Sequence, residues 1–169
     1  MNAKYARPEY ERRWRVEVLP DLGACVDAAR IEDRYFPDTR LRLRRVTPLR
    51  GGESVCKLGQ KVRPDPNDPR LVMHTTLYLA EGEYEWLNRL PGRDLRKVRY
   101  KLAHEGEAFS LDVFEGRHAG LSLLEIETSA EETSLAPPPF AIREVTGDPW
   151  YTGGWLAFAS DEELALAIK

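Results

Sequence analysis

The 169-residue chain has little of what marks several common protein classes. Its two cysteines, Cys25 and Cys56, are far apart and lack metal-ligand spacing, so we expect reduced thiols. No stretch approaches the roughly 18 apolar residues of a membrane span, and residues 1–13 are too polar for a secretory signal. The formal net charge of −3 lacks the basic excess of a general nucleic-acid binder. We therefore expect a cytoplasmic protein with neither membrane nor nucleic-acid partners.

Charged residues, by contrast, are abundant. They make up 31% of the chain, and 19 of the 25 basic residues are arginine. The planar guanidinium group binds phosphate or carboxylate through two parallel hydrogen bonds, which favours an anion-binding protein. A genome rich in G and C would produce the same preference for arginine, so both explanations stay open.

Strand-like patterning covers most of the chain, whose length suits one domain spanning residues 1–169. The expected strands are 9–18, 30–35, 39–47, 53–62, 71–79, 95–102, 107–114, 121–128 and 140–146. Their spacing of about ten residues, with turn signals between them, predicts an antiparallel barrel or sandwich. The expected helices are 22–29, 83–89 and 161–168. Ser160 and Glu163 form a capping-box pattern before the last of these.

Charges recur at every second residue within these strands, where side chains alternate between two faces. Arg40, Arg42 and Arg44 therefore share one face, while Leu41 and Leu43 share the other. The same spacing relates Glu9, Glu11 and Arg13, Lys97 and Arg99, and Glu125 and Glu127. Lys57 and Lys61 are four residues apart and so also share a face. A solvated face normally mixes signs because like charges repel. Alternation alone nevertheless leaves open both a charged tunnel and a sandwich with an outer charged face.

Seven short segments follow one another in a characteristic order. They are EYERR at 9–13, LRLRR at 41–45, KLGQK at 57–61, RKVRY at 96–100, DVFEG at 112–116, EIE at 125–127 and EVT at 144–146. Together they resemble the CYTH domain family, also called triphosphate tunnel metalloenzymes, from Glu9 to about Ala157. The family signature E-x-E-x-K has Arg13 at its last position here, which keeps the charge but not the compact ammonium.

The resemblance implies a mainly β (α+β) fold, an eight-stranded antiparallel β-barrel tunnel with a few covering helices and a C-terminal helix that plugs one end. It implies Mg²⁺ or Mn²⁺ held by Glu9, Glu11, Glu125 and Glu127. Triphosphate would be bound by Arg13, Arg40, Arg42, Arg44, Lys57, Lys61, Lys97 and Arg99. Surface positions remain an alternative for Lys57 and Lys61. Asp112 and Glu144 would be catalytic, holding a second ion or positioning water, or would instead form internal ion pairs with arginines.

The expected reaction is metal-dependent hydrolysis of inorganic triphosphate or another small triphosphate. An adenylate cyclase that converts ATP to cyclic AMP, and a binding protein for polyphosphate or nucleotide without turnover, remain alternatives. His74, His104 and His118 show no ligand spacing and are expected to be surface or hydrogen-bonded residues. The tryptophans are expected in the core or in helix packing.

Overall fold

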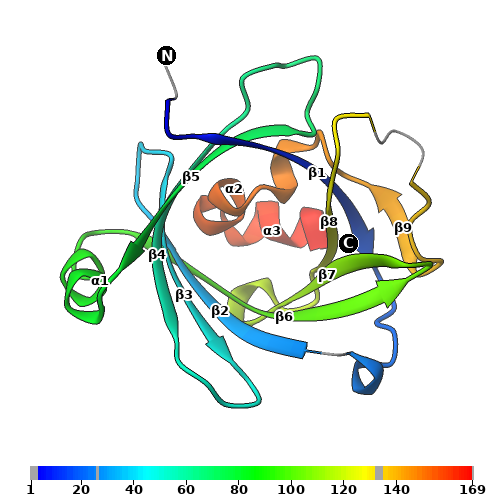
Figure 1. Cartoon of the computed structure of the whole chain (residues 1–169), viewed down its shortest axis with the longest axis horizontal. Helices are drawn as coiled ribbons and strands as arrows, with labels where there is room; N and C mark the ends of the chain where they lie inside the picture. The colour runs from blue at the N-terminus through cyan, green and yellow to red at the C-terminus, as the bar shows by residue number, and fades with distance from the viewer. Residues whose placement is uncertain (1–3, 26, 132–134, 169) are drawn as a thin grey trace.

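The computed structural model describes residues 4–25, 27–131 and 135–168. Within these residues, nine strands form one antiparallel sheet in the order β5-β4-β3-β2-β6-β7-β8-β1-β9. Pairing of β5 with β1 closes eight of them into a barrel, seen in cross-section in Figure 1. The strands are β1 (Arg7–Val16), β2 (Asp27–Tyr35), β3 (Leu41–Pro48), β4 (Val55–Val62), β5 (Leu71–Leu79), β6 (Arg93–His104), β7 (Glu107–Phe114), β8 (Ser122–Thr128) and β9 (Ala141–Glu144). The expected eight-stranded antiparallel barrel is confirmed.

Two of the three α-helices in the described part of the chain lie inside the ring of strands. They are α2 (Gly153–Phe158) and α3 (Asp161–Ile168), whereas α1 (Glu81–Leu87) lies outside it (Figure 1). Short 3-10 helices occupy Leu22–Ala24, Gly116–His118 and Pro149–Tyr151. The capping box before α3 is confirmed, since Ser160 N donates to Glu163 Oε2 at 2.7 Å and Glu163 N donates to Ser160 Oγ at 3.2 Å. None of the described helices is long and apolar enough to cross a membrane.

The sequence interpretation was wrong at two helices. The helix expected at 22–29 is only a 3-10 turn over Leu22–Ala24, and β2 begins at Asp27. Pairing with β3 and β6 on its two sides overrides the helix propensity of its two alanines. The sequence reading missed α2 because it opens with Gly153 and Gly154, which disfavour a helix. The Thr152 side chain accepts a hydrogen bond from Trp155 N and so caps it.

Apolar side chains form one core inside the barrel and others outside it. The inner core joins α2 and α3 to β6, β7 and β8 through residues that include Leu95, Phe114 and Leu156. On the outer face of β3, Leu43 is fully buried beside Tyr84 of α1, and Leu41 packs against the same cluster. The apolar face of β3 therefore points outward, which turns Arg42 and Arg44 toward the interior.

Specific contacts hold the inner helices in place. A Cβ atom added to Gly153 would lie 1.9 Å from Tyr35 Oη, so only glycine permits α2 to approach β2 this closely. The buried Arg15 of β1 donates to Ile168 O at 2.8 Å, and Tyr151 Oη donates to Ala167 O at 3.1 Å. These bonds satisfy carbonyls at the end of α3 that lack helical partners.

Candidate functional site

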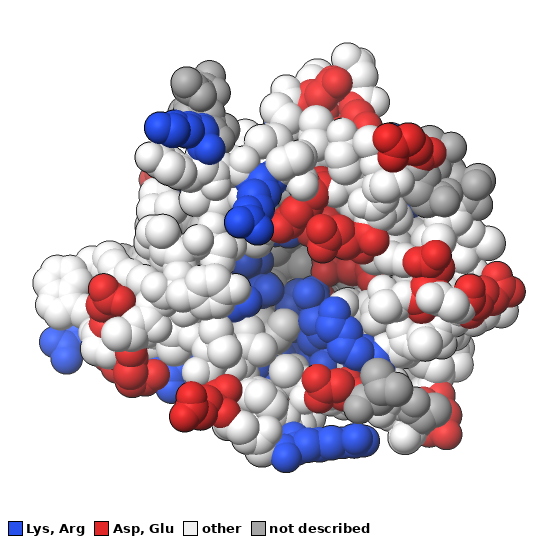
Figure 2. Space-filling model, in the orientation of Figure 1, with Lys and Arg blue, Asp and Glu red and all other residues white. Residues whose placement is uncertain are grey.

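The barrel encloses a cavity of about 340 Å³ beside α2. Eight cationic side chains and two carboxylates line it. Figure 2 shows basic and acidic side chains gathered around an opening in the middle of the molecule. The charged lining residues are Glu11, Arg13, Arg40, Arg42, Arg44, Lys61, Arg63, Lys97, Arg99 and Glu125. Residues Tyr151 to Gly154 and Leu156 contribute uncharged lining from the inner helical segment.

The structure brings most of the predicted substrate-binding residues to this cavity. Seven of the eight line it, the exception being Lys57. Lys57 lies directly across from Arg44 on the neighbouring strand, and its Nζ is 5.2 Å from the centre of the Tyr78 ring. Burial is the main cause that lowers the pKa of Lys57, and the positive charges of Arg44 and Arg42 lower it further. Lys57 thus belongs to the same cationic group without lining the cavity.

A fully buried aspartate, Asp33, holds two of the lining arginines. Arg44 donates to it through Nε at 2.6 Å and Nη2 at 2.7 Å, and Arg42 Nε lies 3.6 Å from its Oδ1. Burial by itself would raise the pKa of Asp33, but Arg44 and Arg42 outweigh it and bring the pKa to about 2. Sequence reasoning missed Asp33. Its position could have identified it, because it lies two residues before Tyr35 on β2, on the face that contacts Arg42 and Arg44 of β3.

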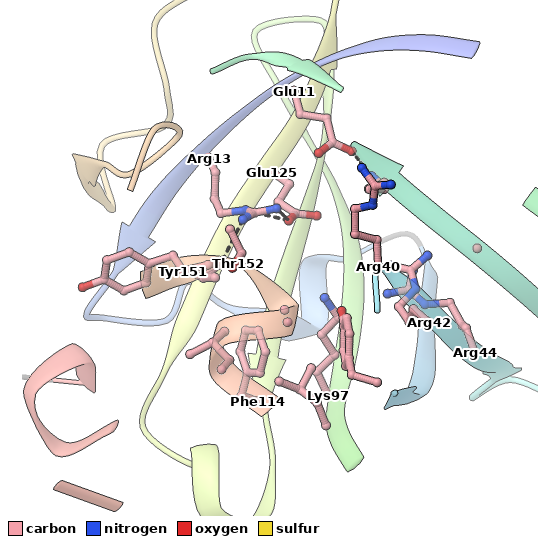
Figure 3. Close-up of a pocket in the computed structure, with 18 of the residues that line it drawn as sticks. Glu11, Arg13, Arg40, Arg42, Arg44, Lys97, Phe114, Glu125, Tyr151 and Thr152 are labelled. Atoms are coloured by element: carbon pink, nitrogen blue, oxygen red, sulfur yellow. Dashed lines mark hydrogen bonds and ion pairs between the residues drawn. The ribbon is translucent and has the colours of Figure 1, made fainter. Parts of the chain in front are cut away.

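A second charged network runs across β6, β7, β8 and β1. Asp112, also fully buried, accepts from Lys97 and from Arg99 Nε and Nη2, both at 2.6 Å. Arg99 Nη2 also donates to Glu125 at 2.5 Å, and Arg13 Nε donates to Glu125 at 2.8 Å (Figure 3). Burial opposes ionisation of Glu125, yet Arg13 and Arg99 hold its pKa well below the usual range.

The two predicted catalytic carboxylates lie away from the cavity surface. Asp112 has no exposed surface and forms the internal ion pairs that the sequence left open as an alternative. Glu144 is on β9, which pairs with β1 outside the closed barrel. There Arg12 donates to it at 2.7 and 3.1 Å, and the Arg12 guanidinium stacks over Trp14, which packs in a separate apolar cluster with Phe109 and Leu124. The structure therefore does not bring Glu144 to Glu125.

Beside the cavity, Glu9 and Glu11 of β1 form a polar cluster with Lys61 of β4 and His74 of β5. Lys61 bonds to Glu11 and lies 3.3 Å from Glu9, and His74 Nδ1 is 2.7 Å from Glu9 Oε1. Thr76 Oγ1 lies 3.1 Å from the other ring nitrogen of His74. His74 is thus hydrogen-bonded, as is His118, whose Nε2 is 2.8 Å from Leu156 O.

Of the four predicted metal ligands, Glu11 and Glu125 line the cavity. Glu9 is engaged by His74 and Lys61, and Glu127 is exposed directly across from Glu11 on β8. No three His, Cys, Asp or Glu side chains of the described residues come together as a metal site. Mg²⁺ usually keeps several waters and is held by one or two carboxylates plus substrate phosphates. The pair of lining carboxylates fits that mode of binding.

Acid should destabilise the fold through Asp33. Its pKa is about 2 in the folded protein, against an ordinary value of 3.8. One pKa unit corresponds to about 1.36 kcal/mol, so ionised Asp33 contributes about 2 kcal/mol to the free energy of unfolding. This contribution is fully present above pH 4 and is lost as the pH falls toward 2. Urea unfolding at pH 5 and pH 3 measures this loss. Asp33→Asn should remove that part of the pH dependence, and a variant that retains all of it would contradict the assignment.

Known proteins resemble this chain in part of its sequence and nearly throughout its fold. No family model matches it. A 57-residue stretch is 42% identical to the inorganic triphosphatase of Acetivibrio thermocellus and covers 34% of this chain and 36% of that protein. A 72-residue stretch is 42% identical to the inorganic triphosphatase of Nitrosomonas europaea and covers 40% of this chain and 47% of that protein. Each alignment thus spans less than half of the curated relative.

The structural similarity extends further. The crystal structure of an inorganic triphosphatase matches 90% of this chain and 95% of its own, with a TM-score of 0.60 and 27% sequence identity. The chain is therefore similar to inorganic triphosphatases locally in sequence and over nearly its whole length in fold.

Proposed function

We propose that this protein is a CYTH-type triphosphatase that hydrolyses inorganic triphosphate, or another small triphosphate, inside the barrel. The observation that carries the proposal is a cavity of about 340 Å³ with eight cationic side chains and two carboxylates on its surface. The sequence relatives and the structural neighbour named inorganic triphosphatase support the same reaction.

The chain's own residues would bind and orient the substrate. Catalysis of phosphoryl transfer rests mainly on positioning and on stabilising the charge that spreads over the phosphate oxygens. Arg13 of β1 reaches the cavity from one side and Arg42 and Arg44 of β3 from another (Figure 3). Arg99 of β6 also lines the cavity, so these arginines can contact successive phosphoryl groups. Their bonds to Asp33, Asp112 and Glu125 fix their orientation before substrate arrives.

We further propose that Mg²⁺ or Mn²⁺ binds with the substrate at Glu11 and Glu125, with Glu9 and Glu127 on the same strands as further ligand candidates. A divalent cation there would neutralise phosphate charge that the carboxylates alone would repel. Displacing Arg13 and Arg99 from Glu125 would also free their donors for phosphate oxygens.

Phosphate release from tripolyphosphate, measured with each metal, tests both proposals. We expect turnover that EDTA abolishes and that Glu125→Gln lowers by about 100-fold, the scale for loss of one preorganised charged group. Glu85→Gln, which alters an exposed carboxylate paired with Arg45 outside the barrel, is the matched control and should stay near the wild-type rate. No release with either metal over a wide pH range would refute the proposed hydrolysis.

The products formed from ATP separate the alternatives. Orthophosphate indicates hydrolysis, and cyclic AMP would identify a cyclase. Thermal stabilisation by triphosphate without any product would identify a binding protein.

A further inference from the structure

Two aspartates lie behind the basic side chains of the cavity, and neither has any exposed side-chain surface. Each stands directly across from an arginine on the neighbouring strand. Asp33 of β2 faces Arg44 of β3, and Asp112 of β7 faces Arg99 of β6. In both pairs the arginine donates through Nε and Nη2 to the two carboxylate oxygens. The same arrangement therefore occurs twice in the barrel.

The two-point bond to Asp33 determines how Arg44 can meet a ligand. With Nε and Nη2 directed at the carboxylate, the Nη1 group is left to face other partners. The neighbouring Arg42 adds a second donor. Its Nε is buried and has no hydrogen-bond partner within the described residues, a state that usually calls for an explanation. Figure 3 shows Arg42 and Arg44 across the cavity from Arg13 and Glu125.

We propose that Asp33 is a positioning residue that fixes the guanidinium groups of Arg42 and Arg44 for binding the triphosphate chain. This inference rests on the proposed function. Asp33 does not line the cavity and would act only through the two arginines. Asp112 is already one of the two predicted catalytic carboxylates. Asp33, in contrast, lies outside the seven segments that resemble the family.

Positioning and simple electrostatics predict opposite effects for loss of this carboxylate. A negative charge behind the arginines weakens the attraction of the cavity for a polyanion. If charge alone mattered, Asp33→Asn would bind triphosphate more tightly. If orientation matters, the freed arginines repel each other, adopt several rotamers and bind less tightly. A residue with a merely structural role would lower stability and leave the affinity of the folded protein unchanged.

The experiment is calorimetric titration of tripolyphosphate into wild type, Asp33→Asn and Asp94→Asn in EDTA-containing buffer. Asp94 is the matched control because Arg34 also bonds to it through Nε and Nη2, at 2.8 and 3.3 Å, away from the cavity lining. Circular dichroism verifies that each variant is folded. We expect the dissociation constant to rise about tenfold or more for Asp33→Asn, the scale of misplaced binding groups, and less than about twofold for Asp94→Asn. Unchanged or tighter binding by folded Asp33→Asn would overturn the inference.

A second variant keeps the test decisive if Asp33→Asn does not fold. Arg44→Lys retains both charges but cannot form the two-point bond, so it should weaken binding in the same way. Unchanged affinity in that variant would also overturn the inference. Failure of the proposed function looks different, because wild type itself would then neither bind nor hydrolyse tripolyphosphate.

Discussion

Arg42→Gln is expected to lower kcat/KM for tripolyphosphate by about 100-fold, the scale observed when one preorganised donor to a developing negative charge is removed. Arg42 lines the cavity, and its side chain is only 15% exposed. Its buried Nε lacks a hydrogen-bond partner among the described atoms. With Nε buried and 3.6 Å from Asp33 Oδ1, the rest of the guanidinium group would donate to substrate phosphate in a site of low dielectric, where a charged hydrogen bond is strong. Steady-state phosphate release measures the effect.

The same strand supplies the control. Arg45, three residues further along β3, lies on the opposite face, where its Nη2 donates to Glu85 at 2.8 Å and its guanidinium stacks on Tyr84 of α1. Arg45→Gln removes one positive charge from the same strand but leaves the cavity intact, so kcat/KM should change less than about twofold. Equal losses in the two variants would show that β3 matters only for folding.

Asp112→Asn is expected to cost about 3–5 kcal/mol of unfolding free energy, because removing one partner leaves buried charges uncompensated. Lys97 and Arg99 both bond to this carboxylate, and Lys97 is itself buried. Burial lowers the pKa of Lys97, and Asp112 opposes that shift. Without Asp112, Lys97 would therefore favour its neutral form more strongly. Urea unfolding at neutral pH measures the loss.

Asp161→Asn provides the comparison for stability. Asp161 also pairs with an arginine, Arg117 at 2.7 Å, but its side chain is 90% exposed. An exposed pair of this kind contributes about 0–1 kcal/mol. If Asp112→Asn proved as stable as Asp161→Asn yet inactive, the predicted catalytic role of Asp112, holding a second ion or positioning water, would be favoured, and the structural role would be wrong.

The sequence alone determined most of the strands and the choice of residues that share a face. Side chains alternate strictly along a strand, so Arg42 and Arg44 had to lie together whatever the fold. The resemblance of the ordered charged segments to the CYTH domain family predicted the closed barrel. The capping box at Ser160 predicted α3, since cap signals act over a single turn of helix.

Only the tertiary structure decided which charges meet. Strand alternation does not say which strands are neighbours, and the pairing of β2 with β3 and β6 is what buries Asp33 behind Arg44. Pairing of β9 with β1 beyond the closed barrel keeps Glu144 beside Arg12, away from Glu125. The close contact of Gly153 with Tyr35 places α2 against the cavity despite its poor helix propensity. Local pattern thus determined the strand faces, whereas long-range hydrogen bonding determined the network of ion pairs that shapes the site.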